Sequence, residues 1–518
     1  MDRRTVLDQI RSRIPTNIWP SYESVLNRIA LYNGINLFQR IMQKIDEVDS
    51  AEAKDGYGGW LPWDLLTFFK WTLAIGNFRP ENRNFISDDS FRTLFSDIKD
   101  LPTSVSIDLQ QSNPGSVSRF MRITAFQQFW LQRSHCGPSV ARQYFLFFQF
   151  SEPQKYDFAQ RFRVHFGVEL KHFLELTFIL TGLLVEDRLR IFSPQWFDSI
   201  AHNYPEGTID QFLKIISCDL FEAANISSVA LLETPLHAQI TEQSPFTRKP
   251  VFRTGNQFKP FTKALLSNFI CYGLYDIFKA ADGALFSPAF GTLMEKYIAY
   301  SLDHIKSEYI PESQQQRILG RGISTVDFII PLGPFTLLVE SKAIELNARS
   351  RIDPSPGILY GALKNSAIKA VEQCFFAADR IKSGTIKIES GQRFICLIVT
   401  YKELFLGRTQ DSWPQLMAEH MEKYLCENKL SPELIDPEDI YFISIDEWDL
   451  LQEWRRKKSP QEVADFFNDV ALKNSQPATA KFSLGMHLAE AGAETHLPEY
   501  LQLPLDDFFG TMRKKIRT

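Results

Sequence analysis

The sequence has no long hydrophobic run, no closely spaced pair of cysteines and no large net charge. Its most apolar run, residues 173–185, contains Glu175, so we expect no membrane-spanning helix. The N-terminus is not followed by an uninterrupted apolar stretch, which argues against a signal peptide. The six cysteines are scattered, without a Cys-x-x-Cys pair or a close histidine, so neither a zinc site nor a disulfide framework is expected. These absences predict a soluble, cytoplasmic protein with no membrane partner.

Two catalytic motifs are also missing. The sequence has neither a Gly-x-x-x-x-Gly-Lys-[Ser/Thr] phosphate-binding loop nor a Gly-x-Ser-x-Gly elbow, so an ATPase or a serine hydrolase lacks support. The net charge of −5 does not indicate nucleic-acid binding by the chain as a whole, and any such binding must come from local patches. The length of 518 residues predicts roughly two to four domains. The 43 phenylalanines favour many packed helices.

The first half of the chain shows the periodicity of helices. Apolar residues recur at helical spacing over residues 6–14, 22–45 and 62–75, whereas residues 101–115 look like a connection or a small strand. We expect a helical N-terminal region over residues 1–108 and a helical, Phe-rich region with a basic linker over 109–285. A further domain is expected over 286–455, followed by a helical, partly ordered tail over 456–518.

Two stretches contain no acidic residue. In the first, residues 109–151, aromatic residues alternate with Arg119, Arg122, Arg133 and Arg142. Such a mixture either grips a nucleic-acid strand or belongs to helices with core aromatics and solvated arginines, and we favour the helices. The second stretch, residues 243–275, either steers a polyanion into a site or is an ordinary basic linker. Its basic residues are Arg248, Lys249, Arg253, Lys259 and Lys263.

The most informative stretch is residues 324–342, where two short apolar segments flank a Pro-Leu-Gly-Pro turn. This pattern predicts a β-hairpin. Asp327 lies on the first strand, and Glu340 and Lys342 end the second on one face. Burying such charges costs several kcal/mol unless they are paired or hold a metal. Two carboxylates plus water are a common way of binding Mg²⁺.

Further polar residues accompany this hairpin. Residues 290–302 and 367–381 read as helices, with Glu295 and Gln373 beside their apolar faces. Residues 394–400 and 440–445 read as buried strands, so this part of the chain alternates helix and strand. The loop at residues 344–360, with Arg349 and Arg351, is a candidate substrate clamp.

In this order and spacing, Glu295, Asp327, Glu340-Ser-Lys342 and Gln373 resemble the PD-(D/E)XK nuclease superfamily. The resemblance covers about residues 285–450, and Val326 replaces the proline of the motif. It implies an α/β nuclease core, a central mixed sheet flanked by helices, joined here to a large, mainly α-helical N-terminal region. The resemblance also implies Mg²⁺ or Mn²⁺ as cofactor and DNA as partner.

Residue roles follow from the same resemblance. Asp327, Glu340 and the main-chain carbonyl of Ser341 are expected to bind the metal ion. Glu295 is expected to hold a second metal ion or a metal-bound water. Lys342 would orient or deprotonate the attacking water, and Gln373 would orient the assembly.

The expected function is that of a Mg²⁺-dependent deoxyribonuclease, cutting endonucleolytically as an effector of prokaryotic anti-phage defence or of a mobile element. Several alternatives stay open. The charged residues could form a buried salt-bridge network, or the chain could be a nucleic-acid-binding or scaffold subunit with a silent nuclease fold. An RNase or an exonuclease would share the motif. The helical N-terminal half could bind a partner protein, and oligomerisation is left open.

Overall fold

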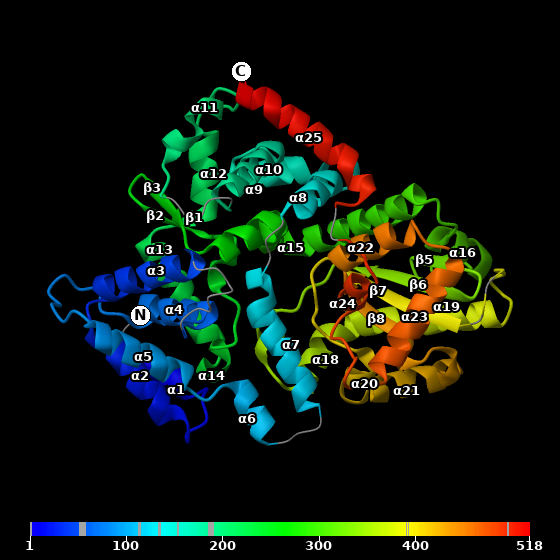
Figure 1. The fold of residues 1–518 in the computed structure, drawn as a ribbon, viewed down its shortest axis with the longest axis horizontal. Coiled ribbons are helices and arrows are strands. Elements are labelled where there is room, and N and C mark those ends of the chain that lie inside the picture. Colours follow the sequence, from blue (N-terminus) through cyan, green and yellow to red (C-terminus); the bar gives the residue numbers. More distant parts are fainter. Residues whose placement is uncertain are drawn as a thin grey trace.

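The computed structural model describes residues 3–50, 59–111, 115–132, 136–152, 155–184, 191–389, 391, 393–494 and 497–517. The chain is mainly helical and contains two small mixed sheets. Figure 1 shows the first helices at one end of the long axis and the larger sheet at the other end. The helix α15 (Lys263–His304) runs between these two ends.

The N-terminal region is helical, as expected. Its helices are α1 (Arg3–Arg11), α2 (Trp19–Leu31), α3 (Gly34–Ser50), α4 (Pro62–Ile75) and α5 (Asp88–Lys99). The single helix expected over residues 22–45 is wrong, because the chain breaks between α2 and α3. There the Asn33 side chain accepts a hydrogen bond from the main-chain N–H of Asn36 at 2.9 Å, as a capping residue does. These helices share one apolar core with α13 (Leu220–Glu233).

The Phe-rich region continues with short helices. They are α6 (Ser104–Gln110), α7 (Ser116–Gln128), α8 (Gly137–Tyr144), α9 (Phe158–Phe166), α10 (Leu170–Ile179), α11 (Asp198–Ala201), α12 (Thr208–Ile216) and α14 (Leu236–Gln239). Residues 101–115, expected as a connection or a small strand, contain the helix α6. Thr103 caps the start of this helix, because its side chain accepts a hydrogen bond from the N–H of Ser106. Arg133 lies outside the described residues.

The second acid-free stretch is not an irregular linker. It forms the antiparallel strands β2 (Val251–Thr254) and β3 (Gln257–Pro260), then enters α15. The strand β1 (Ser217–Cys218) pairs in parallel with β2 and completes the smaller sheet. α15 passes through the boundary expected at residue 285 and is kinked at Asp282, whose φ of −140° and ψ of 33° are not helical.

The larger sheet contains the predicted hairpin. Its strands are β4 (Ile310–Pro311), β5 (Phe328–Pro331), β6 (Phe335–Lys342), β7 (Arg393–Thr400) and β8 (Ile440–Ser444), in that spatial order. β4, β5 and β6 are antiparallel neighbours, whereas β6, β7 and β8 are parallel. Gly333 takes a φ of 68° in the turn between β5 and β6, a conformation that glycine adopts without steric cost.

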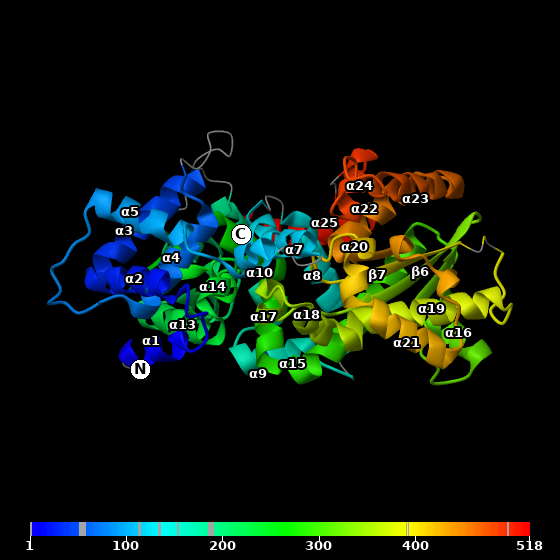
Figure 2. The ribbon, with the colours of Figure 1, turned by 90° about the horizontal axis from the view of Figure 1, so that it is seen from below.

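Helices cover both faces of this sheet, as Figure 2 shows from below. On one face, α15, α22 (Ile445–Arg455) and α23 (Pro460–Asn474) share a core with Leu337 and Val339. On the other face, α19 (Lys369–Lys382) and α21 (Ala418–Asn428) pack against Leu338. The remaining helices of this part are α16 (Glu312–Leu319), α17 (Ala348–Ile352), α18 (Pro356–Leu363) and α20 (Thr409–Leu416).

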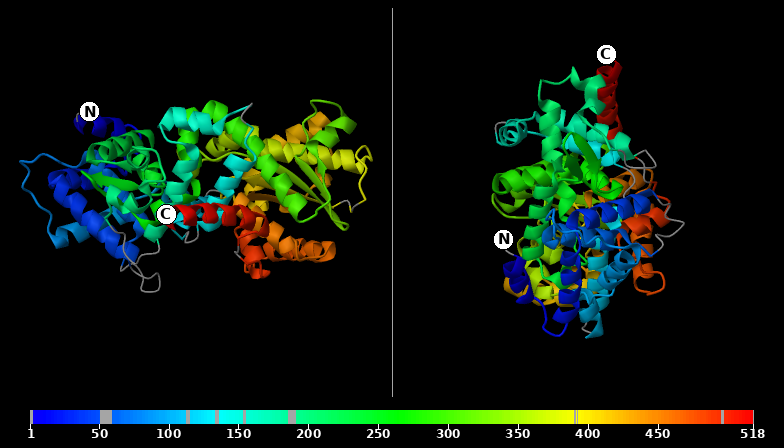
Figure 3. Two further views of the ribbon diagram at one scale, coloured as in Figure 1. Left: turned by 90° about the horizontal axis from the view of Figure 1, so that it is seen from above. Right: turned by 90° about the vertical axis from the view of Figure 1, so that its left-hand side faces the viewer.

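The segment expected as a tail is helical and packed. It contains α23, α24 (Leu484–Glu490) and α25 (Glu499–Arg517). Tyr500, Leu501 and Phe508 of α25 are buried, and the rings of Phe508 and Tyr144 lie 5.1 Å apart. Figure 3 shows α25 lying across the middle of the molecule. Over the described part of the chain, no helix has both the length and the apolar character needed to cross a bilayer.

Candidate functional site

Three carboxylate residues lie in one row across the larger sheet. The pairing of β5 with β6 matches Phe328 with Val339, so the next pair outward is Asp327 with Glu340. The pairing of β4 with β5 matches Pro311 with Phe328, which places Glu312 beside Asp327 on the other side. The N–H of Glu312 donates to the Asp327 carbonyl at 2.8 Å. The row therefore reads Glu312, Asp327, Glu340 at the carboxyl end of β6.

Asp327 and Glu340 are locked together by main-chain hydrogen bonds. The N–H of Asp327 donates to Glu340 Oε2 at 2.9 Å. The N–H and the hydroxyl of Ser341 both donate to Asp327 Oδ2 at 2.7 Å. The other oxygen of this carboxylate, Oδ1, receives no hydrogen bond from the described residues. Both residues are buried, with 9 % of Asp327 and 2 % of Glu340 exposed.

Lys342 and Gln373 complete the cluster. The Lys342 ammonium donates to Glu340 Oε1 and, at 3.2 Å, to Gln373 Oε1. The Gln373 amide donates in turn to the carbonyl of Thr325 at 2.7 Å. Gln373 reaches the site from α19, which covers this face of β6. The hairpin and α19 thus bring four of the predicted residues, Asp327, Glu340, Lys342 and Gln373, into one hydrogen-bonded group.

The protonation of this group reflects crowded negative charge. Burial, and then the charge of Asp327, raise the pKa of Glu340 to about 8. Burial also raises the pKa of Asp327, although the hydrogen bonds from Ser341 oppose it. For Lys342, burial lowers the pKa, but the charge and hydrogen bond of Glu340 outweigh burial and raise it. Lys342 is therefore a cation at neutral pH.

Two further carboxylates stand at the rim of the cluster. Glu295, on α15, is exposed, yet surrounding protein and the charges of Asp327 and Glu312 raise its pKa to about 7. Sequence reasoning missed Glu312, because it follows a strand of only two residues. The one available signal was the pair Ile310-Pro311 before a glutamate that begins a helix.

The residues present fit a hard divalent cation. Asp327 and Glu340 place carboxylate oxygens side by side at the carboxyl end of β6, and the charges of Asp327 and Glu312 raise the pKa of the nearby Glu295. Within the described ranges, no three His, Cys, Asp or Glu side chains are arranged to hold a metal by themselves. A Mg²⁺ ion here would keep water ligands in addition to Asp327 and Glu340, which is its usual preference. The Ser341 carbonyl as a ligand stays a prediction.

The basic residues singled out from the sequence fall into two groups. Lys249 and Arg253 pair with Glu222, and Lys259 pairs with Asp46. The Lys263 N–H donates to Asp49. Lys249 and Arg253 thus tie β2 and the residues before it to α13, and Lys259 and Lys263 tie β3 and the start of α15 to α3. Arg248 and Arg351 instead line a cavity of about 690 Å³, and Arg349 lines another of about 240 Å³.

The three arginines of the first acid-free stretch that the structure describes, Arg119, Arg122 and Arg142, make structural contacts. The aromatics Phe126, Trp130, Phe145 and Phe147 belong to the core, as favoured, but the expected solvation of the arginines is wrong. Arg119 pairs with Asp108 at 2.9 Å. Arg122 donates to the carbonyls of Ser350 and Asp353 at 2.6 and 2.9 Å. Arg142 is 2 % exposed and pairs with Asp449.

No family model matches the chain, and the comparisons with curated proteins and with solved structures give no match. The site therefore has to be interpreted from its own chemistry.

Proposed function

We propose that this protein is a Mg²⁺-dependent nuclease that hydrolyses phosphodiester bonds in DNA, with an α/β nuclease core around the larger sheet. The observation that carries the proposal is the hydrogen-bonded group of Asp327, Glu340, Lys342 and Gln373 at the carboxyl end of β6. Two buried acids and a charged lysine, drawn from a hairpin and a covering helix, are costly to fold. A divalent cation and an anionic substrate would offset that cost.

The side chains would divide the chemistry as follows. Asp327 and Glu340 would hold the ion, and Ser341 keeps Asp327 oriented through its N–H and its hydroxyl. When bound, Mg²⁺ lowers the pKa of a bound water and neutralises charge on the phosphate. Lys342 has a raised pKa, so it would donate a hydrogen bond to the attacking water or to a phosphate oxygen. It would not act as a general base.

Gln373 and Glu295 would have supporting roles. Gln373 fixes the direction of the Lys342 ammonium, because its amide is itself tied to Thr325. The Glu295 carboxyl group has a pKa of about 7. Near neutral pH it would therefore release its proton to solvent and then bind a cation or accept a hydrogen bond from a water molecule. We extend the proposal to an effector of anti-phage defence or of a mobile element, in which the N-terminal helices recognise a trigger or a partner protein.

The test is cleavage by isosteric variants. The parent protein, Asp327→Asn, Glu340→Gln and Lys342→Met would be incubated with supercoiled plasmid, linear DNA and RNA, in Mg²⁺ and in EDTA. We expect each variant to lose roughly 100-fold or more in cleavage rate, a typical effect of removing an electrostatic contributor to catalysis. Glu427→Gln is the matched control, because Glu427-Asn-Lys429 repeats the Glu-x-Lys spacing on the exposed end of α21. Variants that cut as fast as the parent would refute the assignment.

The substrates in this experiment separate the alternatives. Nicking and linearisation of the plasmid would indicate an endonuclease, whereas attack on linear DNA alone would indicate an exonuclease. Cleavage confined to RNA would keep the site and change the substrate. A parent protein that binds DNA without cutting it in Mg²⁺ or Mn²⁺ would favour a binding or scaffold subunit with a silent nuclease fold.

A further inference from the structure

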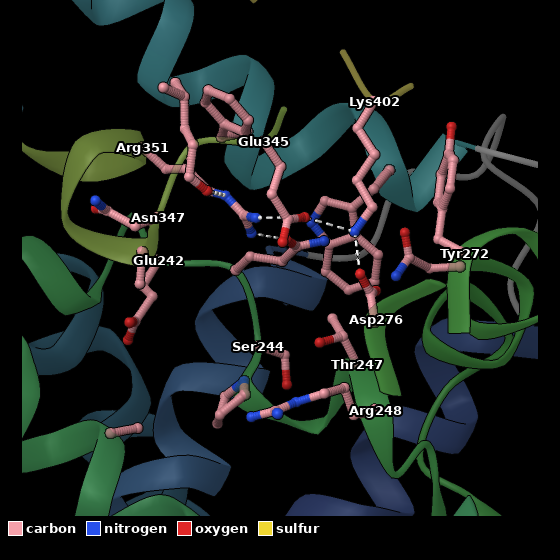
Figure 4. A pocket seen from close by; sticks show the side chains of 18 of the residues that line it. Glu242, Ser244, Thr247, Arg248, Tyr272, Asp276, Glu345, Asn347, Arg351 and Lys402 are labelled. Carbon is pink, nitrogen blue, oxygen red and sulfur yellow. Dashed lines mark hydrogen bonds and ion pairs between the residues drawn. The ribbon is translucent and has the colours of Figure 1, made fainter. Parts of the chain in front are cut away.

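A cavity of about 690 Å³ lies apart from the carboxylate cluster, between α13 and the segments that leave β6 and β7. Its walls come from α7, α13 and α15, from the segment after β6 and from the segment after β7. A volume of this size is typical of sites for small organic ligands. Figure 4 shows the polar side chains that line it.

One wall of the cavity is a chain of ion pairs. Glu345 accepts hydrogen bonds from Lys279 at 3.0 Å and from Lys402 at 2.9 Å, and it pairs with Arg351 at 3.4 Å. Lys402 also pairs with Asp276. Figure 4 shows Arg351, Glu345, Lys402 and Asp276 joined in this order. Burial opposes ionisation of Glu345, but Lys402, Arg351 and Lys279 lower its pKa to about 2.

The charge inside the cavity is unbalanced in favour of an anion. Another lining carboxylate, Glu242, is neutralised by Lys70, which lies 2.8 Å away outside the cavity. Burial and the nearby Glu447 raise the pKa of Glu403 well above its ordinary value, which favours its neutral form. Arg248 is exposed and has no ion-pair partner among the described residues. Arg248, Lys279, Arg351 and Lys402 thus face only Asp276 and Glu345 within the cavity, with Glu233 exposed at its edge.

The cavity also contains a polar group without a partner. Asn268 lines it, is only 5 % exposed, and forms no side-chain hydrogen bond within the described residues. Buried polar groups are nearly always hydrogen-bonded, so the unpaired amide of Asn268 at the cavity wall indicates a ligand that pairs with it.

Aromatic rings form another part of the lining. Phe405 contacts Phe126 and Phe129 edge to face, with ring centroids 4.8 and 5.6 Å apart. Phe405 is held at a φ of 49°, a left-handed conformation that costs a non-glycine residue free energy. Trp130 and Tyr272 line the same cavity but are buried, whereas Phe129 and Phe405 are half-buried. Ring faces that stay partly accessible can stack on flat heterocycles.

We infer that this cavity binds a nucleotide, with the base among the aromatic rings and the Asn268 amide, and the phosphate toward Arg248. An amide side chain offers both a donor and an acceptor to the edge of a base. A guanidinium group matches the oxygens of a phosphate. The nucleotide is either free in solution or an unpaired nucleotide of a nucleic-acid strand, since both have the same chemistry.

The position of the cavity connects it to the carboxylate cluster. Glu345 follows Lys342 by three residues, and Lys402 follows the last residue of β7 by two. A ligand that contacts this wall therefore touches the segments leaving both strands. The inference does not rest on the proposed nuclease activity, because binding is measured without cleavage.

The experiment is isothermal titration calorimetry of the full chain in EDTA. The probes are AMP, GMP, CMP and UMP. Adenosine and inorganic phosphate serve as partial ligands, the first without the phosphate and the second without the nucleoside, and an oligothymidylate serves as the single strand. We expect at least one mononucleotide, or the strand, to bind. We expect a binding mononucleotide to bind more tightly than either partial ligand. Arg248→Gln and Asn268→Asp should each weaken binding about tenfold or more, since each removes an anion or base contact.

Arg79→Gln is the matched control, because Arg79 is also exposed and without a side-chain partner among the described residues, but lies outside the cavity. It should leave the affinity unchanged. Binding of the strand alone, weakened by Arg248→Gln and Asn268→Asp, would assign the cavity to an unpaired nucleotide of that strand. Absence of binding by all the probes, or binding that both variants leave unchanged, would overturn the inference. Arg248 is exposed, so its variant remains informative if Asn268→Asp fails to fold.

Discussion

The main-chain N–H of Asp327 donates to the carboxylate of Glu340 at 2.9 Å, while the N–H and hydroxyl of Ser341 donate to the carboxylate of Asp327 at 2.7 Å. The two strands of the hairpin thus exchange hydrogen bonds through their acidic side chains. This arrangement fixes the positions of both carboxylates before any cation arrives. It also brings two acidic groups close together, which makes both the stability of the fold and the binding of cations depend on pH.

The first consequence is a dependence of stability on pH. The pKa of Glu340 is about 8 in the folded chain and 4.5 as an ordinary carboxyl group, so folding takes up a proton between these values. The free energy of unfolding should therefore fall as the pH rises from about 4.5 to about 8 in EDTA. Glu340→Gln mimics the protonated acid, so part of this slope should disappear. Chemical unfolding between pH 5 and pH 8.5 measures it.

The comparison isolates Glu340 because other buried acids are the same in both proteins. Asp49, whose pKa burial raises to about 7, contributes a slope of the same sign to parent and variant alike. Glu427→Gln should keep the full slope of the parent. An unchanged slope in Glu340→Gln would contradict the protonation of Glu340.

The second consequence concerns divalent cations. Mg²⁺ should raise the unfolding temperature of the parent protein, and more at pH 8 than at pH 6, because protons on Glu340 and Glu295 compete with the ion. At 100 times the dissociation constant the stabilisation is about 2.7 kcal/mol. Asp327→Asn should lose it. Scanning calorimetry with Mg²⁺ or EDTA is the measurement, and equal stabilisation of parent and variant would place the ion elsewhere.

The third prediction concerns Gln373 as a positioning residue. Gln373→Met removes the acceptor 3.2 Å from the Lys342 ammonium and keeps the size of the side chain. We expect the cleavage rate constant to fall about 10- to 100-fold with little change in KM, since residues that orient a catalytic group have effects of this size. Glu372, the neighbouring residue on the same helix, contacts His420 and not Lys342, so the control variant Glu372→Gln should retain activity. A rise in KM at an unchanged rate constant would assign Gln373 to substrate binding.

The hairpin was predictable because its information is local. Apolar residues with a turn between them indicate two strands, and Glu340 and Lys342, two apart, had to share a face. Pro62–Ile75 was predictable for the same reason, since a proline can begin a helix and the apolar spacing continues to its end. The break at Asn33 was not predictable, because Asn33 is held in its capping position by a hydrogen bond from its main-chain N–H to the carbonyl of Asn84, which is distant in the sequence.

Pairings between distant parts of the chain were not predictable. Glu312 joins the acidic row through a strand of two residues, too short to show a period. The cavity residues Lys279, Glu345 and Lys402 come from three segments that only the fold brings together. Arg142 looked solvated because its neighbours in sequence include no acid, whereas its partner Asp449 lies on α22.

That partnership gives the fourth prediction. Asp449 accepts hydrogen bonds from Arg142 of α8, Tyr297 of α15 and Tyr500 of α25, at 3.0, 2.8 and 2.5 Å. Asp449→Ala removes this partner and leaves the buried Arg142 paired with the half-exposed Asp446 at 2.8 Å, so it should cost up to about 3–5 kcal/mol of the free energy of unfolding. Tyr500→Phe removes one hydrogen bond and should cost about 1 kcal/mol. Denaturant titration followed by circular dichroism measures both.

A double variant separates the charge from the packing. Arg142→Met combined with Asp449→Leu removes both charges, so it should be less destabilised than Asp449→Ala alone, because the buried Arg142 charge no longer has to be compensated. Glu427→Gln, which affects an exposed pair with Lys423 on α21, should change stability by less than about 1 kcal/mol. If the double variant is as unstable as Asp449→Ala, shape and packing hold these four helices together, and the ion pair does not.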